Sequence, residues 1–254
     1  MKKYIFYMLA AVFALAACEK NTFKTTEHTY PDGFALLKVG LFTMDSIAKT
    51  QLVYNNGVRI SSPFASPYPY PGGGYNTGGG TGGDYFKLNA GVNKFEFYTT
   101  NQGTYNLVSK LFETTQTLEA NKKYTLYVAD TATSKAAVLA PDNGTTPVDS
   151  GFANIRFINL VPNSTAVDFY QNNTLLKGNI KYKEFTDFFN MPSGVADTFS
   201  IRIAGSAPGP AIFASAYYRL AINTNKRILS FISRGYLGVV DATRKANVSV
   251  AVNQ

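Results

Sequence analysis

Apolar and polar side chains alternate along several short stretches of this chain, with the period of two that is typical of β-strands. The alternation is clear in residues 94–98 (Lys-Phe-Glu-Phe-Tyr), in 124–129 and in 155–161. Turn signals separate these stretches, for example Asn55-Asn56-Gly57, where Asn and Gly tolerate positive φ. Tyr (17) and Phe (19) are abundant, which suits packing on a pleated sheet. We therefore predict an all-β chain.

The strand pattern occurs twice. The stretch Gly151–Asn173 repeats features of Gly33–Asn56, and several of these features share one spacing of 118 residues. The members of this set are Gly33/Gly151, Phe34/Phe152, Ala35/Ala153, Ser46/Ser164 and Ala48/Ala166. Later landmarks, Phe95/Phe199 and Asn121/Asn225, pair at the shorter spacing of 104 residues. One β-domain used twice, with extra residues in the first copy, accounts for both spacings.

This duplication divides the chain into two tandem antiparallel β-sandwiches. The first repeat spans residues 33–140, the linker 141–150 and the second repeat 151–254. The extra residues of the first repeat are Ser61–Asp84, rich in Gly, Pro and Tyr, and we call them the inserted segment. Because Pro removes a donor and Gly removes stiffness, this segment is predicted to be a long loop rather than a central strand.

The N-terminus predicts the compartment. Met1-Lys2-Lys3 precedes the apolar run Tyr4–Ala17, which has the length of a signal peptide. The run ends in Leu15-Ala16-Ala17-Cys18, which resembles the bacterial lipobox, and Cys18 is the only cysteine. We therefore predict a lipoprotein signal peptide over 1–17, a lipid on Cys18 and a flexible tether over 18–32. The protein would be an outer membrane lipoprotein, with its periplasmic or cell-surface orientation left open.

The inserted segment offers the candidate ligand-binding residues. The tyrosines in and beside it are Tyr68, Tyr70, Tyr75 and Tyr85. One interpretation is a tip whose rings stack against a sugar or a protein partner. The other, favoured by composition, is a low-complexity spacer with no ligand.

No catalytic, metal or cofactor site is expected. The sole histidine, His28, lies in the tether, which excludes a Ser-His-Asp triad or a His-rich zinc site in the folded repeats. Asp168 stands without a partner acid and is interpreted as a structural carboxylate that bonds a turn amide. The chain is therefore expected not to be an enzyme.

The charge does not point to nucleic acid. Lys and Arg number 24 against 16 Asp and Glu, and the basic residues are scattered rather than clustered. The expected partners are the membrane, through lipidated Cys18, and a glycan or an envelope protein; the oligomeric state stays open.

Two short motifs suggest modification. Asp45-Ser46-Ile47 and Asp130-Thr131-Ala132 resemble the Asp-Ser/Thr-aliphatic acceptor for O-glycosylation in exported proteins of Bacteroidetes. Ser46 and Thr131 are therefore candidate O-glycosylation sites.

The second repeat also carries a family signature. Ala-Asn-Ile-Arg-Phe-Ile-Asn (153–159), Pro-Asn-Ser (162–164) and Ala-Val-Asp-Phe-Tyr (166–170) resemble the opening of the family called domain of unknown function 4397. Met-Pro-Ser-Gly (191–194) and Asn-Lys-Arg-Ile (225–228) match later landmarks. This family is common in lipoproteins of Bacteroidetes-type bacteria, often in tandem. The resemblance implies an immunoglobulin-like or prealbumin-like β-sandwich and brings no established activity or site residues.

The sequence thus predicts a non-catalytic, membrane-anchored cell-envelope lipoprotein with a binding, adhesion or scaffolding role, glycans being among its candidate ligands. The alternative is a fimbria-like structural subunit that assembles by strand addition. A carboxylate-based glycan hydrolase has the weakest support.

Overall fold

The structure is a computed structural model. It describes residues 33–43, 50–65, 68–70, 74–75, 85–101, 104–130, 135–147, 149–192, 198–206, 226–241 and 244–253. Their regular elements are all strands, which confirms the predicted all-β class. Within these ranges no helix is long and apolar enough to span a membrane. The expectations for Cys18, Ser46, Thr131, the signal peptide and the tether lie outside the described residues.

The strands of the first repeat follow the alternating stretches of the sequence. They are β1 (Phe34–Phe42), β2 (Thr50–Asn55), β3 (Val58–Arg59), β4 (Phe64–Ala65), β5 (Tyr68–Tyr70), β6 (Gly74–Tyr75), β7 (Phe86–Asn89), β8 (Gly91–Thr100), β9 (Leu107–Leu118), β10 (Lys123–Asp130) and β11 (Lys135–Pro141). The sequence of residues 107–117 is compatible with a strand or a short helix, and in the structure these residues belong to strand β9.

The second repeat contributes β12 (Phe152–Asn159), β13 (Ala166–Gln171), β14 (Thr174–Lys181), β15 (Phe189–Pro192), β16 (Phe199–Ile203), β17 (Ile228–Arg234) and β18 (Asn247–Val252). The sequence pattern also predicts strands over 185–191, 212–220 and 236–240, and the first and last of these differ in the structure. Of 185–191 only β15 is a strand, and Phe185 makes an isolated bridge to Ile158. Tyr236, from the expected strand 236–240, likewise makes only a bridge. The strand expected over 212–220 lies outside the described residues.

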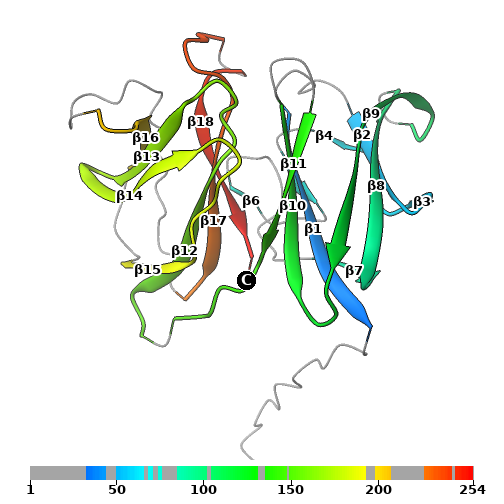
Figure 1. Cartoon of the computed structure of the whole chain (residues 1–254), viewed down its shortest axis with the longest axis horizontal. Coiled ribbons are helices and arrows are strands. Elements are labelled where there is room, and N and C mark those ends of the chain that lie inside the picture. The colour runs from blue at the N-terminus through cyan, green and yellow to red at the C-terminus, as the bar shows by residue number, and fades with distance from the viewer. Residues whose placement is uncertain are drawn as a thin grey trace, which may run out of the picture. The chain divides into compact units, whose positions relative to one another are not determined.

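Each repeat has two sheets. The outer sheet of the first repeat has the order β3-β2-β8-β9, with β4 on β2, and its inner sheet has the order β11-β10-β1-β5, with β7 on β1. The second repeat has the inner sheet β15-β12-β17-β18-β6 and the outer sheet β14-β13-β16. Figure 1 shows them as successive layers, with the two inner sheets side by side in the middle. The sandwiches are not wholly antiparallel as predicted, because β1·β10 and β12·β17 run parallel.

A separate apolar core lies between the two sheets of each repeat. In the first repeat it contains Leu37, Val39, Phe95, Phe97 and Leu126 among other buried side chains. The core of the second repeat is aromatic and is built around Phe169, which packs against three phenylalanines. Their ring centroids lie 4.5 Å (Phe157), 5.8 Å (Phe199) and 5.3 Å (Phe231) from that of Phe169.

Equivalent turns show how the two repeats correspond. Gly33 and Gly151 have φ of 93° and 90°, and Asn56 and Asn172 have φ of 48° and 53°. At a third turn, however, Asn121 N donates to Phe34 O and Lys226 N donates to Phe152 O, both at 2.7 Å. Asn121 therefore corresponds to Lys226, one residue later than the sequence alignment placed it.

The inserted segment is not only a loop. Its strand β5 pairs with β1 of the first repeat, and its strand β6 pairs with β18 of the second. Both positions are sheet edges, as its prolines and glycines require. The segment therefore joins the inner sheets of the two repeats.

Candidate functional site

The outward faces of the two inner sheets pack against each other. Their apolar contact takes side chains from both repeats: Phe42, Tyr127, Ala129, Ala140, Ile158, Leu160, Ile232 and Ala251. Each inner sheet is therefore buried on both faces, one against its own outer sheet and one against the other repeat. Because the repeats share this apolar layer, we expect them to behave as one body.

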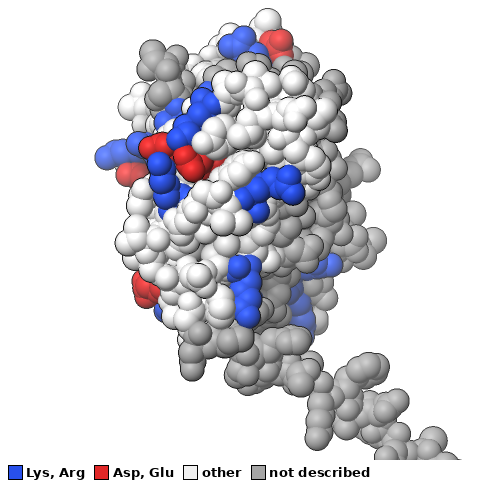
Figure 2. All heavy atoms as spheres, turned by 90° about the vertical axis from the view of Figure 1, so that its right-hand side faces the viewer, with Lys and Arg blue, Asp and Glu red and all other residues white. Residues whose placement is uncertain are grey.

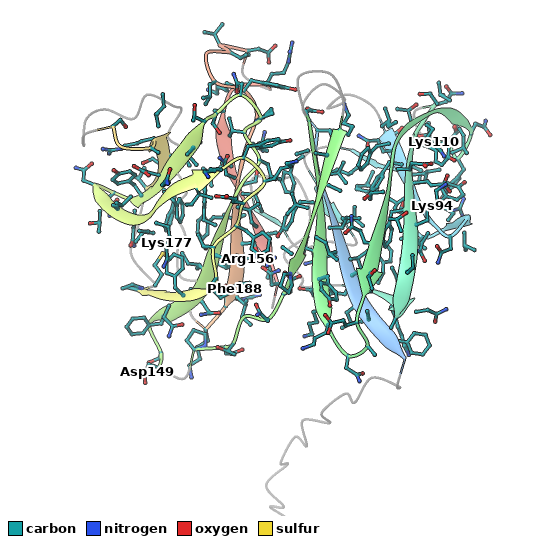
Figure 3. The ribbon with its side chains drawn as sticks, viewed as in Figure 1. Lys94, Lys110, Asp149, Arg156, Lys177 and Phe188 are labelled. Atoms are coloured by element: carbon teal, nitrogen blue, oxygen red, sulfur yellow. The ribbon has the colours of Figure 1, made fainter. Side chains whose placement is uncertain are left out.

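A buried polar cluster continues this contact and is centred on Arg156 of β12 (Figure 3). Only 1% of Arg156 is exposed. Its Nη2 forms an ion pair with Asp142 and lies 3.1 Å from the Tyr127 hydroxyl. Its Nη1 donates to Pro141 O at 2.6 Å, and its Nε donates to Ser230 Oγ at 2.9 Å. Every nitrogen of the guanidinium thus has a partner, which offsets part of the cost of burying the charge.

Lys38 of β1 is the counterpart of Arg156 in the first repeat. It lies five residues after Gly33, as Arg156 does after Gly151, and it is fully buried. Its Nζ donates to Val252 O of the second repeat at 2.5 Å, whereas Arg156 donates to Pro141 O beside the first. Each cation therefore reaches across the junction to the last residue of a strand, Val252 of β18 or Pro141 of β11.

An aromatic ring accompanies each cation at the equivalent place. Lys38 Nζ lies 4.9 Å from the ring centroid of Tyr85, and the Arg156 guanidinium carbon lies 4.8 Å from that of Phe188. Both rings come just before the strand that pairs with β1 or β12, namely β7 or β15. The contacts have the geometry of cation–π pairs.

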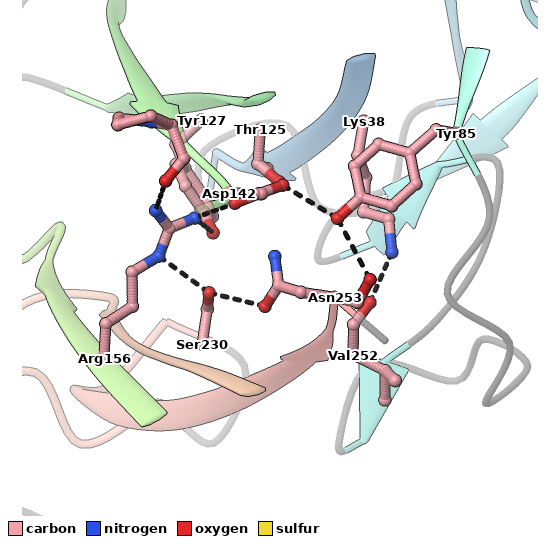
Figure 4. Close-up of polar contacts among 10 residues, drawn as sticks. Lys38, Tyr85, Thr125, Tyr127, Asp142, Arg156, Ser230, Val252 and Asn253 are labelled. Atoms are coloured by element: carbon pink, nitrogen blue, oxygen red, sulfur yellow. Dashed lines mark hydrogen bonds and ion pairs between the residues drawn. The ribbon is translucent and has the colours of Figure 1, made fainter. Parts of the chain in front are cut away.

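The polar partners are also duplicated. Thr125 lies opposite Lys38 in the strand register and donates to Asp142 at 2.6 Å, while Ser230 lies opposite Arg156 and donates to Asn253 at 2.8 Å. The two repeats thus meet through corresponding residues, as two subunits do across a two-fold axis. We call Lys38, Tyr85, Thr125, Asp142, Arg156, Phe188, Ser230 and Asn253 the junction cluster. Figure 4 labels all of them except Phe188, which is labelled in Figure 3.

Tyr85 joins the two halves of the cluster. Its hydroxyl lies 2.9 Å from Asp142 Oδ2 and 3.2 Å from the backbone oxygen of Asn253. Burial, and then the nearby charge of Asp142, raises the pKa of Tyr85. Burial also raises the pKa of Tyr127. Both hydroxyls therefore stay protonated in the folded protein at neutral pH.

A cavity of about 440 Å³ lies beside the junction cluster and opens to solvent. It takes its lining from the first repeat, the linker and the second repeat: Glu119, Asn121, Lys122, Lys123, Tyr124, Pro141, Asp142, Asn143, Gly144, Ile228 and Asn253. We call it the junction cavity. The backbone N–H of Asn121, a lining residue, donates to Phe34 O, so the cavity lies near the start of β1.

The structure separates the four predicted tyrosines. Tyr68 and Tyr70 lie in β5 on the edge of the first inner sheet, and Tyr75 lies in β6 on the edge of the second. Tyr85 is half-buried, with its hydroxyl bonded inside the junction cluster and Lys123 Nζ 5.9 Å from its ring. Ligand binding by this set stays a prediction.

The sequence interpretation missed the central residues of the junction. The alternation places Arg156 in a strand without a site role, and Asp142 falls in the predicted linker 141–150. One signal was available: the repeat alignment places a cation at both position 38 and position 156, inside strands that are otherwise apolar.

Two buried carboxylates, those of Asp142 and Asp168, are occupied structurally. Asp168 accepts Asn179 N at 2.7 Å and Gly205 N at 2.9 Å, which confirms its predicted role in bonding turn amides. Asp142 is buried and ion-paired, so it is a poor general acid or base. No group of three or more His, Cys, Asp or Glu side chains within the described ranges could hold a metal ion.

The surface charges are mixed rather than gathered. Figure 2 shows basic side chains spread over the face of the first repeat, with acidic ones next to some of them. On the outer sheet Lys110 lies 2.6 Å from both Glu96 and Glu113, and Lys94 lies 3.2 Å from Glu113. Such exposed pairs contribute little to stability.

A contact of Tyr182 between the two repeats predicts how the stability of the protein depends on pH. Tyr182 of the second repeat donates to Asp130 O of the first at 2.6 Å, and burial followed by the charge of Asp130 raises the pKa of Tyr182 to about 12. Because an unfolded tyrosine titrates near ~10, the unfolded state loses this proton first as pH rises. We expect stability to be unaffected by this group below pH ~10 and to fall between ~10 and about 12.

Ultraviolet difference titration of the wild type and Tyr182→Phe checks this prediction. The variant should lack one late-titrating tyrosine and should lose less stability over the same pH interval. A Tyr182 that titrates at the ordinary value would contradict the contact with Asp130.

Comparisons with known proteins bear on the family. A family profile described as "Domain of unknown function (DUF4397)" matches residues 53–164 and 153–229, two overlapping copies of the domain. A comparison with curated proteins finds no match.

Proposed function

Since the chain belongs to the DUF4397 family, whose function is unknown, we propose from its sequence and geometry that it is a non-catalytic, membrane-anchored lipoprotein of the cell envelope. Its proposed role is to bind, with adhesion or scaffolding as the outcome of binding. The Leu15-Ala16-Ala17-Cys18 motif supports the anchor and a place at the outer membrane.

The junction cavity carries the binding proposal. Ligand sites favour concave places of a few hundred Å³ between domains, and this cavity of about 440 Å³ is lined by both repeats. The junction cluster fixes one repeat against the other, so the walls of the cavity are held in place before a ligand arrives. Such preorganisation reduces the entropy lost on binding.

The anchor is tested by replacing the thiol. We expect the wild type in the membrane fraction, with a diacylglycerol on the peptide that begins at Cys18, because each buried CH₂ adds ~0.8 kcal/mol to membrane binding. Cys18→Ser should move the protein to the soluble fraction, whereas Asn21→Ser should leave it anchored. A membrane-bound Cys18→Ser protein would contradict the proposed anchor.

Protease treatment of intact cells then separates a surface from a periplasmic position. A glycan array with the soluble protein tests binding. If no glycan and no envelope protein binds, while the anchor is present, the binding role is wrong, and so are the adhesion and scaffolding that depend on it.

One observation favours the alternative of a structural subunit. Strand β9 (Leu107–Leu118) has 12 residues, ends the first outer sheet, and carries several exposed side chains. A long edge strand can accept a strand from another molecule. Polymers detected by light scattering after N-terminal trimming would support this alternative, and a persistent monomer would exclude it.

A further inference from the structure

We propose that the junction cavity binds an acidic saccharide, with Lys122 and Lys123 as its anion-binding residues; this deepens the binding role proposed above and rests on it. The cavity volume of about 440 Å³ is large for a single inorganic ion. It suits a ligand of one or two sugar rings, within the usual range for small-molecule sites.

Two ammonium groups, those of Lys122 and Lys123, and two carboxylates, those of Glu119 and Asp142, belong to residues that line the cavity. Lys122 and Lys123 both line it, and among the described residues no carboxylate forms an ion pair with either ammonium group. Asn121 and Asn143 add side-chain amides. Both oxygens of Asp142, in contrast, already accept, Oδ1 from Arg156 and Oδ2 from Tyr85 and Thr125.

A buried donor adds to this set. Asn253 lines the cavity and is 4% exposed. Its Oδ1 accepts from Ser230, whereas its Nδ2 has no hydrogen-bond partner. Buried polar groups without partners are uncommon, and they mark places where a further acceptor would be stabilising.

These features together indicate the ligand class. Free ammonium and amide donors favour a ligand with many oxygen acceptors and a negative charge. The apolar walls from Tyr124, Pro141 and Ile228 suit the carbon-bearing face of a sugar ring. A carboxylated saccharide combines both properties. A lipid headgroup can also carry a negative charge. A membrane surface is flat, however, so its headgroups would contact the rim of the cavity rather than its interior.

The duplicated turn supplies a matched control. Lys226 and Arg227 occupy in the second repeat the places of Asn121 and Lys122, since Lys226 N bonds to Phe152 as Asn121 N does to Phe34. Neither Lys226 nor Arg227 lines the junction cavity. Linker residue Gly144 packs closely against the second repeat. A Cβ added at Gly144 would lie 2.6 Å from Ile228 and 2.9 Å from Phe188.

The experiment uses the mature chain with Cys18→Ser and titrates it with digalacturonate, by calorimetry, next to neutral lactose. We expect digalacturonate to bind and lactose to bind at least roughly tenfold more weakly, because charge-assisted hydrogen bonds are the stronger ones. Lys122→Ala/Lys123→Ala should weaken digalacturonate binding by about tenfold or more. Lys226→Ala/Arg227→Ala should leave it within about twofold, because neither side chain lines the cavity.

Other outcomes would overturn the inference. Equal binding of lactose and digalacturonate removes the anionic preference but leaves a saccharide-binding function. Equal losses in the two double variants would mean general attraction to a basic surface. Binding to phosphatidylglycerol vesicles but not to digalacturonate would assign these lysines to a lipid surface. Failure with all saccharides, together with a blank glycan array, would remove the proposed binding function as well.

Discussion

Replacing Arg156 with alanine is expected to lower the free energy of unfolding by about 3–5 kcal/mol. The side chain is buried, and its removal leaves the carboxylate of Asp142 in the junction without its ionic partner. Pro141 O and the Tyr127 hydroxyl lose a donor in the same step. Urea unfolding at neutral pH, compared with the exposed control Lys181→Ala, measures the loss.

A double variant shows whether the loss comes from an orphaned charge. Arg156→Met together with Asp142→Leu removes both charges, and we expect it to be more stable than Arg156→Ala alone, because burying an ion pair gains little over apolar packing. If Arg156→Ala lowers the free energy of unfolding by less than ~1 kcal/mol, its effect is no larger than that of an ordinary surface substitution. In that case the junction cluster would not hold the repeats together.

Replacing Phe169 with alanine is expected to cost about 3–5 kcal/mol, the range for large aromatic side chains in a core. Phe169 is fully buried and lies at the centre of the phenylalanine cluster of the second repeat. Its removal leaves a cavity that the three rigid neighbouring rings can fill only in part. Leu175, 51% exposed on the same repeat, is the control, and Leu175→Ala should change stability by no more than ~0.5 kcal/mol.

This variant also tests whether the repeats unfold together. Because the apolar layer between the inner sheets belongs to both repeats, we expect one unfolding transition that shifts as a whole. Near-ultraviolet circular dichroism and tryptic digestion should report the same midpoint. Two separate transitions, with only one moved by Phe169→Ala, would contradict the single cooperative unit.

The correspondence across the junction suggests how the duplication is used. Lys38 and Arg156 occupy equivalent positions and make equivalent contacts, but Tyr85 brings a hydroxyl where Phe188 has none. The cavity is asymmetric too, because Lys122 and Lys123 line it whereas Lys226 and Arg227 do not. The duplication thus supplies a stable symmetric interface, and the departures from symmetry supply the candidate site.

The inserted segment changes how a deletion must be designed. Removal of the whole segment also removes β5 and β6 from the edges of the two inner sheets. A loss of binding after such a deletion would not distinguish a missing ligand contact from a disturbed junction. The tyrosines are therefore better changed one at a time.

The sequence by itself determined the local structure and the duplication. Period-two alternation is a property of neighbouring residues, so strands such as β8, β10 and β12 could be recognised from their own side chains. Turn chemistry is also local, which is why the turn at Asn56 could be predicted. The Asn121 landmark was misaligned by one residue because matching basic residues outweighed the backbone conformation of the turn.

Only the tertiary structure decided what each strand face meets. Alternation shows that a strand has two faces, but it does not show whether the polar face meets water or another sheet. Alternation therefore does not reveal that Arg156 and Lys38 are buried between the repeats. The junction cavity was equally hidden, since its walls come from positions as distant as Glu119 and Asn253. Contacts of that range arise from sheet packing, which is set by the whole fold rather than by any one stretch of the chain.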